Sequence, residues 1–145
     1  SPHVGGVGST YGGNPLACVA ALAALEHLSK PETLAHAARV EQTVRRTFEP
    51  MKAELPVLGD VRGIGAMMAL EFVRDPLSKE PWSDFSMNAI KQASQRGVVL
   101  IRAGLYTNCI RFLPALEIPQ DMLEEALGVV KEAIHATHQA MAATA

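Results

Sequence analysis

The sequence lacks most features that mark the specialised classes of small protein. Only two of its 145 residues are cysteines, Cys18 and Cys109, and their separation fits no CxxC or Cys/His spacing. The sequence therefore predicts neither a disulfide framework nor a metal site, and both thiols are expected to be buried small apolar groups. No apolar run reaches the ~18 residues that span a bilayer, and no signal peptide is evident. We expect a cytoplasmic protein without a membrane segment.

Positive charge is not in excess either. Lys and Arg number 13 against 15 Asp and Glu, which gives a formal net charge of −2. A protein that binds nucleic acid or an anionic membrane through bulk charge would show a basic excess, so neither partner is expected. Since 48% of the residues are hydrophobic and 19% are charged, disorder is excluded and a folded domain is expected.

Glycine and proline divide the chain into short elements. Asn14 and Pro15 predict a helix start, and residues 16–28 are apolar on almost all sides, so this helix is expected to be buried against something outside the chain. Ser29 and Glu32 predict a capping box that starts a second helix. Pro50 and Pro56 predict a kink and an end to that helix.

The remaining pattern alternates strands and helices. Two strands are expected within 57–73, a helix over 83–96, strands at 98–101 and 109–113, and a last helix after 118–119. Strands joined both by turns and by helices predict an α+β fold, in which helices pack on one small, mostly antiparallel sheet.

Two local features point to anion binding. Five glycines crowd residues 1–13 ahead of a helix, a pattern that suits a phosphate and equally suits a flexible turn; it matches neither a P-loop nor a dinucleotide fingerprint. Arg111 lies in a strand between bulky apolar residues, which is costly unless an anion meets it. A structural salt bridge and a substrate carboxylate explain Arg111 equally well.

Three ordered strings carry a resemblance to a known family. They are Ser9–Cys18 (STYGGNPLAC), Gly59–Met67 (GDVRGIGAM) and Gly104–Pro114 (GLYTNCIRFLP). Together they resemble the C-terminal third of the class III aminotransferases that use pyridoxal phosphate (PLP), with order and spacing similar to the 4-aminobutyrate branch. Ser9 departs from the glycine usually found before that threonine.

The resemblance implies roles for particular residues. Thr10, with Ser9 beside it, would reach the PLP phosphate of the other subunit in a homodimer, and Arg111 would bind the α-carboxylate of the substrate. The reaction would move an amino group from an ω-amino acid to a 2-oxo acid. The family's Schiff-base lysine, which belongs to a large N-terminal domain, matches no residue here, so the chain alone is expected to be inactive.

The resemblance also implies a division of the chain. Residues 1–13 would be a cofactor-facing loop left from the large domain, 14–30 a connecting apolar helix, and 31–145 the small C-terminal domain of a fold-type I PLP enzyme. On this reading the chain is a piece of a longer protein. The alternatives are a stand-alone α+β ligand-binding or regulatory module, and a PLP mutase or decarboxylase of the same fold.

Overall fold

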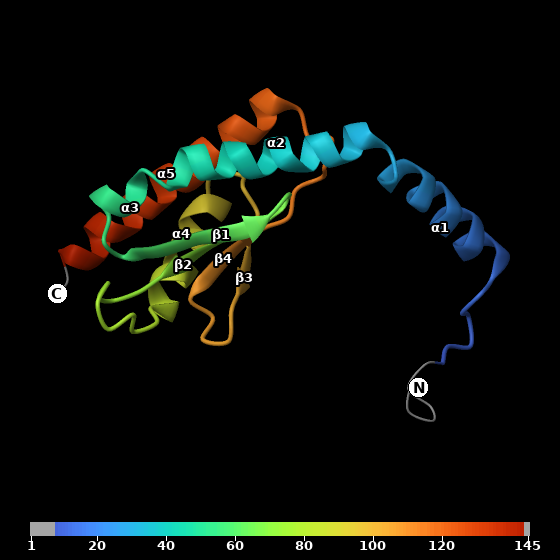
Figure 1. Ribbon diagram of the computed structural model, residues 1–145. Coiled ribbons are helices and arrows are strands. Elements are labelled where there is room, and N and C mark those ends of the chain that lie inside the picture. The colour runs from blue at the N-terminus through green and yellow to red at the C-terminus, as the bar shows by residue number, and fades with distance from the viewer. Residues whose placement is uncertain (1–7, 144–145) are drawn as a thin grey trace. The chain divides into compact units, whose positions relative to one another are not determined.

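A computed structural model describes residues 8–143 of the chain (Figure 1). The chain divides into two compact units, residues 1–34 and 35–145. The part of the expected loop that precedes Gly8 lies outside the described residues.

The first unit contains helix α1 (Pro15–Leu28). Its start follows the prediction, because the Asn14 side chain accepts a hydrogen bond from the Ala17 N–H at 3.0 Å and Pro15 is the first helical residue. None of its residues is buried within this chain, and five large apolar side chains along it are more than half exposed: Leu16, Val19, Leu22, Leu25 and Leu28. The predicted burial of Cys18 is wrong for the same reason, whereas Cys109 is buried as predicted.

The predicted capping box at Ser29 is also wrong. Ser29 ends α1, and its hydroxyl and its backbone N–H both donate to the Leu25 carbonyl, at 2.7 and 3.0 Å. Helix α2 (Pro31–Phe48) begins only two residues later, so the serine that signalled a helix start satisfies the end of the preceding helix instead. Pro50 does break the helix as predicted, and a short helix α3 (Met51–Glu54) follows it.

Four strands form a wholly antiparallel sheet in the second unit. They are β1 (Leu58–Ile64), β2 (Met67–Phe72), β3 (Ile101–Ala103) and β4 (Cys109–Phe112), in the order β1-β2-β4-β3. Helices α4 (Ser83–Ser94) and α5 (Gln120–Ala142) complete the unit. Helices packed on a small antiparallel sheet confirm the α+β prediction.

One strand boundary was predicted wrongly. Residues 98–100 are not part of β3, which begins at Ile101. The chain turns at Gly97, whose φ is 90°, and the Val98 N–H donates back to the Ala93 carbonyl at 3.1 Å. Val98 and Leu100 pack against the core through their side chains. Val98 and Leu100 are therefore apolar because they pack on the core, without strand pairing, whereas Val99 is exposed.

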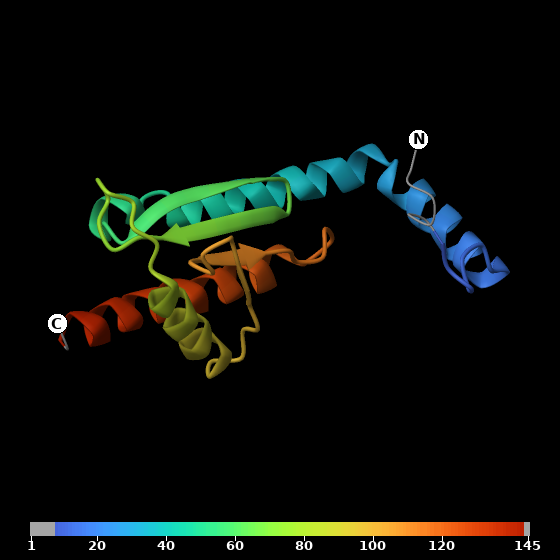
Figure 2. The ribbon, with the colours of Figure 1, turned by 90° about the horizontal axis from the view of Figure 1, so that it is seen from below.

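The helices cover one face of the sheet. Figure 1 shows α2 and α5 along the same side of the strands, and Figure 2 shows the unit from below. Phe72 of β2 packs on Phe85 of α4 with ring centroids 4.9 Å apart, and Phe112 of β4 stacks on Phe48 of α2 at 5.6 Å. Because side chains alternate along a strand, the residues between these core positions lie on the other, open face.

The β1–β2 hairpin is tied to α2 by a carboxylate. Glu41 accepts a hydrogen bond from the Gly65 N–H at 2.7 Å and is paired with Arg45 at 2.9 Å, while Arg45 donates to the Gly63 carbonyl at 3.1 Å. The Gly65 N–H and, next, Arg45 hold the pKa of Glu41 below its usual value. Gly63 permits the close approach of the two strands, since a Cβ there would lie 2.2 Å from the Met67 oxygen.

Candidate functional site

Two arginines lie in one row across the open face of the sheet. Arg62 of β1 is opposite Ala69 of β2, Ala69 is opposite Arg111 of β4, and Arg111 is opposite Ile101 of β3. Directly opposed residues of antiparallel strands point to the same face, so both guanidinium groups leave the sheet on its open side. They are separated by the small side chain of Ala69.

Arg62 is fully engaged by carboxylates. It is paired with Glu71 through a short contact and with Asp60 at 3.3 Å, and it lies 3.7 Å from the Cys109 sulfur. Burial alone would raise the pKa of Asp60, but hydrogen bonds from the Val61 N–H and Arg62 hold that pKa below its usual value. Arg62 therefore has a structural role that balances the charges of the hairpin.

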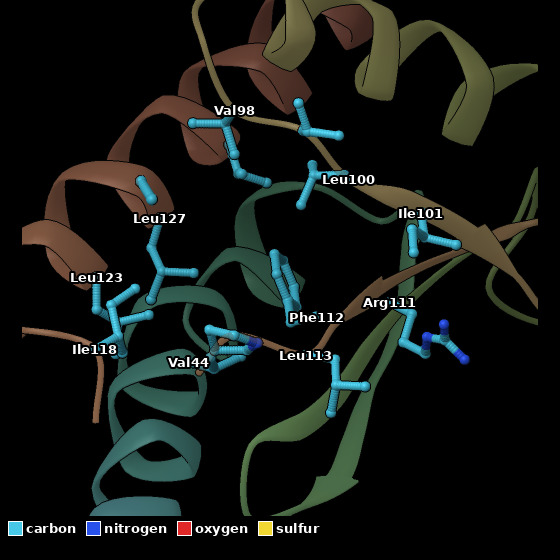
Figure 3. A pocket seen from close by; sticks show the side chains of 14 residues that line it. Val44, Val98, Leu100, Ile101, Arg111, Phe112, Leu113, Ile118, Leu123 and Leu127 are labelled. Carbon is cyan, nitrogen blue, oxygen red and sulfur yellow. The ribbon is translucent and has the colours of Figure 1, made fainter. Parts of the chain in front are cut away.

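Arg111 has no such partner. Within residues 8–143 its side chain forms no ion pair and no hydrogen bond, and its buried Nε is left unsatisfied. Figure 3 shows its guanidinium directed away from the apolar cavity of about 230 Å³ that Leu127, Val98 and Phe112 help to line. A buried guanidinium nitrogen without an acceptor is uncommon, because leaving a charged group unpaired is costly. The arrangement leaves Arg111 free to receive a carboxylate in its planar fork.

One residue close to Arg111 in the sequence, Asn108, was not predicted to belong to the site. Asn108 directly precedes β4, is 2% exposed, and donates from its side-chain amide to the Phe72 carbonyl at 2.9 Å and to Glu71 at 3.3 Å. Its only signal in the sequence is a polar residue between a turn and a strand.

Ser9 and Thr10 belong to the first unit, so their place is described apart from Arg111. Both are exposed, in a turn where the Gly12 N–H donates to the Ser9 carbonyl at 3.3 Å. Neither hydroxyl forms a hydrogen bond with another described residue. Hydroxyls placed ahead of a capped helix are suitable donors for a phosphate.

The five lysines, all within the described residues, are exposed: Lys30, Lys52, Lys79, Lys91 and Lys131. A lysine that reacts as an amine is normally desolvated, and none of these is. Over residues 8–143 no helix is long and apolar enough to cross a membrane, and no cluster of His, Cys, Asp or Glu is arranged to hold a metal ion.

Comparison with known proteins decides the family. The family model described as aminotransferase class-III matches residues 1–134. The chain belongs to this family. The resemblance in the three sequence strings is thereby confirmed, and the reading of the chain as an unrelated binding module is not supported.

Three relatives illustrate the match. The chain is 38% identical over 130 residues to the 4-aminobutyrate aminotransferase of Mycobacterium tuberculosis, covering 90% of this chain and 29% of that protein. It is 34% identical to the 5-aminovalerate aminotransferase of Pseudomonas aeruginosa, covering 88% and 30%. The solved ω-transaminase of Pseudomonas jessenii in complex with PMP superposes with a TM-score of 0.79 at 26% identity, covering 92% and 29%. The chain thus spans about 30% of the length of the relatives it matches.

Proposed function

We propose that this chain forms the small C-terminal domain of a PLP-dependent aminotransferase that moves an amino group from an ω-amino acid, such as 4-aminobutyrate, to a 2-oxo acid. The family match and the names of the 4-aminobutyrate and 5-aminovalerate aminotransferases support the reaction class and the substrate class. Since these relatives are named as aminotransferases, a mutase or decarboxylase of the same fold is the less favoured reading.

Arg111 carries the substrate part of this proposal. Of the two arginines in the open-face row, Arg62 is paired with two carboxylates of this chain, and Arg111 has none among residues 8–143. An amino acid and a 2-oxo acid share the carboxylate group, which a guanidinium binds through two parallel hydrogen bonds. Arg111 would therefore bind and orient the substrate carboxylate.

The residues present fit one end of the cofactor. When bound, PLP supplies the electron sink that amino transfer requires. Thr10, with Ser9, would donate hydroxyl hydrogen bonds to the cofactor phosphate of the partner subunit, since these hydroxyls are exposed and have no acceptor among the described residues. The exposed lysines of this chain are unsuited to covalent attachment, so we infer that the chain alone does not catalyse transamination.

Residues outside this chain complete the proposal. We infer a division into a cofactor-facing loop at 1–13, a connecting helix at 14–30 and the small domain at 31–145, joined to a large domain and assembled as a homodimer. The exposed apolar side chains of α1 support this, because a helix that is apolar on all sides is stable in water only when it is covered.

Kinetics of the complete protein that carries this chain, loaded with PLP, test the proposal. We expect amino transfer from 4-aminobutyrate to a 2-oxo acid, with Arg111→Lys raising KM for the carboxylate substrate about ten- to hundredfold through loss of the bidentate pair. Arg102→Lys, at an exposed arginine of the neighbouring strand, is the matched control and should leave KM unchanged. Absence of transfer, or a destabilised Arg111→Lys variant with unchanged kinetics, would contradict the proposal.

A further inference from the structure

Arg111 lies on β4, a strand of only four residues. Cys109 and Arg111 point to the open face and Ile110 and Phe112 to the core, so a slip of one residue would turn Arg111 toward the core. The turn ahead of the strand adds no apolar anchor, since Leu105 and Tyr106 within it are 90% and 63% exposed. The side-chain contacts that hold Thr107 and Asn108, the two residues directly before β4, are polar.

Asn108 supplies part of those contacts. Its side-chain amide donates both of its hydrogens, to the Phe72 carbonyl at 2.9 Å and to Glu71 Oε1 at 3.3 Å. Its own backbone carbonyl accepts from the Phe72 N–H at 2.9 Å. A buried asparagine whose two amide hydrogens are both used is bound in a single orientation, and here it joins the residue directly before β4 to the end of β2.

The contact with Glu71 extends this connection to β1. The Glu71 carboxylate accepts from Asn108 on one oxygen and from Arg62 on the other. Hydrogen bonds to an ionised acceptor are stronger than those between neutral groups. The chain Arg62–Glu71–Asn108 thus runs across the open face beside Arg111 and includes no contact to Arg111 itself.

The turn is held from the helix side as well. Thr107 has a φ of 54°, a left-handed conformation that is uncommon for threonine, and its carbonyl lies 2.7 Å from the hydroxyl of the fully buried Ser86 of α4. Such a conformation persists where its surroundings determine it. The backbone before β4 is therefore restrained to one conformation, and Asn108 is the first residue after the turn that is bonded to the sheet.

We propose that Asn108 is a positioning residue for the carboxylate site: its buried amide fixes β4 on β2 and so fixes the register that presents Arg111 on the open face. That Arg111 binds the substrate rests on the function proposed above, whereas the role of Asn108 in fixing β4 on β2 concerns this chain alone.

Hydrogen exchange of the 145-residue chain tests whether Asn108 fixes β4 on β2. Asn108→Asp keeps the size of the side chain, removes both donors and places a second carboxylate against Glu71. We expect amide exchange in residues 109–113 to accelerate about ten- to hundredfold, as the loss of two hydrogen bonds predicts, with α2 unchanged. Asn88→Asp, at a half-buried asparagine of α4 whose side-chain amide faces Met141 of α5, is the matched control. Asn108→Ser, which retains one donor, should show a smaller acceleration.

Several results would overturn this role. Unchanged exchange in β4, or equal acceleration throughout the unit, removes Asn108 as the residue that fixes this strand. If Asn108→Asp does not fold, Asn108→Ser decides; if neither folds, Asn108 is a general folding residue and the proposal fails.

The complete enzyme tests the link to substrate. The donors are compared in single-turnover reactions of the PLP-loaded enzyme without a 2-oxo acid, since that acceptor also carries a carboxylate. In Asn108→Asp we expect the concentration of a carboxylate-bearing amino donor that gives half the maximal rate to rise about tenfold, while the rate with a primary amine that lacks a carboxylate is retained, because only the former needs Arg111 in place. Equal loss with both donors would overturn the link. The unmodified protein could transfer no amino group while exchange in Asn108→Asp accelerates in β4 alone. In that case the proposed function fails, and the role of Asn108 in fixing β4 is retained.

Discussion

Replacing Phe48 by alanine should remove a large part of the stability of the second unit. Phe48 is fully buried, and its ring stacks on that of Phe112 with centroids 5.6 Å apart and an interplanar angle of 18°. Truncation of a buried phenylalanine costs about 3–5 kcal/mol, from lost transfer energy and from the cavity that remains. Because total stability of a domain is about 5–15 kcal/mol, Phe48→Ala removes a substantial fraction of it. Phe112 follows Arg111, so the same cavity lies beneath the candidate site.

Urea denaturation monitored by the single tryptophan gives the measurement. Trp82 is partly buried and packs on Phe85 with ring centroids 5.2 Å apart, so its fluorescence reports the folded core. With a slope of about 2 kcal/mol per molar urea, we expect the midpoint to fall by about 2 M with the slope unchanged. Leu77→Ala, at a side chain that is 92% exposed, is the control and should change stability by less than about 0.5 kcal/mol. A midpoint shift as small as that of the control would refute the placement of Phe48 in the core.

Three further predictions concern other parts of the chain. Gly63→Ala should destabilise the hairpin by at least about 2 kcal/mol, because its Cβ would meet a backbone oxygen at 2.2 Å, whereas Gly128→Ala in an open helical position should stabilise by about 0.5–1 kcal/mol; thermal unfolding measures both. Glu41→Gln should weaken the pH dependence of stability: the lowered pKa of Glu41, bound to the Gly65 N–H, stabilises the fold above its unfolded pKa, and this is lost as pH falls through the folded pKa. Leu22→Glu on α1 should reduce self-association of the chain in sedimentation, since it places charge on an exposed apolar surface.

Each of these has a result that contradicts it. Normal stability of the Gly63→Ala protein would mean that the two strands are farther apart than the structure places them. An equal effect of Glu132→Gln, at an exposed glutamate of α5, would show that the acid sensitivity is general. A monomer at high concentration without any substitution, or a Leu77→Glu control as effective as Leu22→Glu, would remove α1 as the associating surface.

Local chemistry explains what was predictable from the sequence. Asn14 with Pro15 predicts a helix start, and Pro50 predicts a break, because each acts on its own few residues. The apolar residues around Arg111 likewise predict a strand at 109–113, and β4 covers Cys109–Phe112. These features require no knowledge of distant residues.

The errors occur where a distant or neighbouring element decides. Residues 98–100 are apolar, as a strand would be, but the side chains of Val98 and Leu100 pack against the core while the backbone of this segment stays outside the sheet. Ser29 is a residue type that favours helix starts, but its hydroxyl donates to the Leu25 carbonyl at the end of α1. Cys18 lies in an apolar run, and the helix that this run forms has no buried residue. A sequence pattern predicts which side chains are apolar enough to be buried. It does not predict which other element covers them, because that element is distant in the sequence.

The two arginines of the open face show the same limit at the candidate site. Each lies in a strand beside apolar residues, and from the sequence a salt bridge explains either one. Strand pairing alone does not separate them, because Ala69 of β2 is opposite both; the difference is that the Glu71 carboxylate and Asp60 of β1 both pair with Arg62. One arginine is thereby neutralised and the other is left with an unsatisfied Nε on the same face. The register of β2 against β4 places Arg111 on the open face, and the carboxylates of Asp60 and Glu71, which pair with Arg62, leave Arg111 as the arginine that is free to bind a carboxylate.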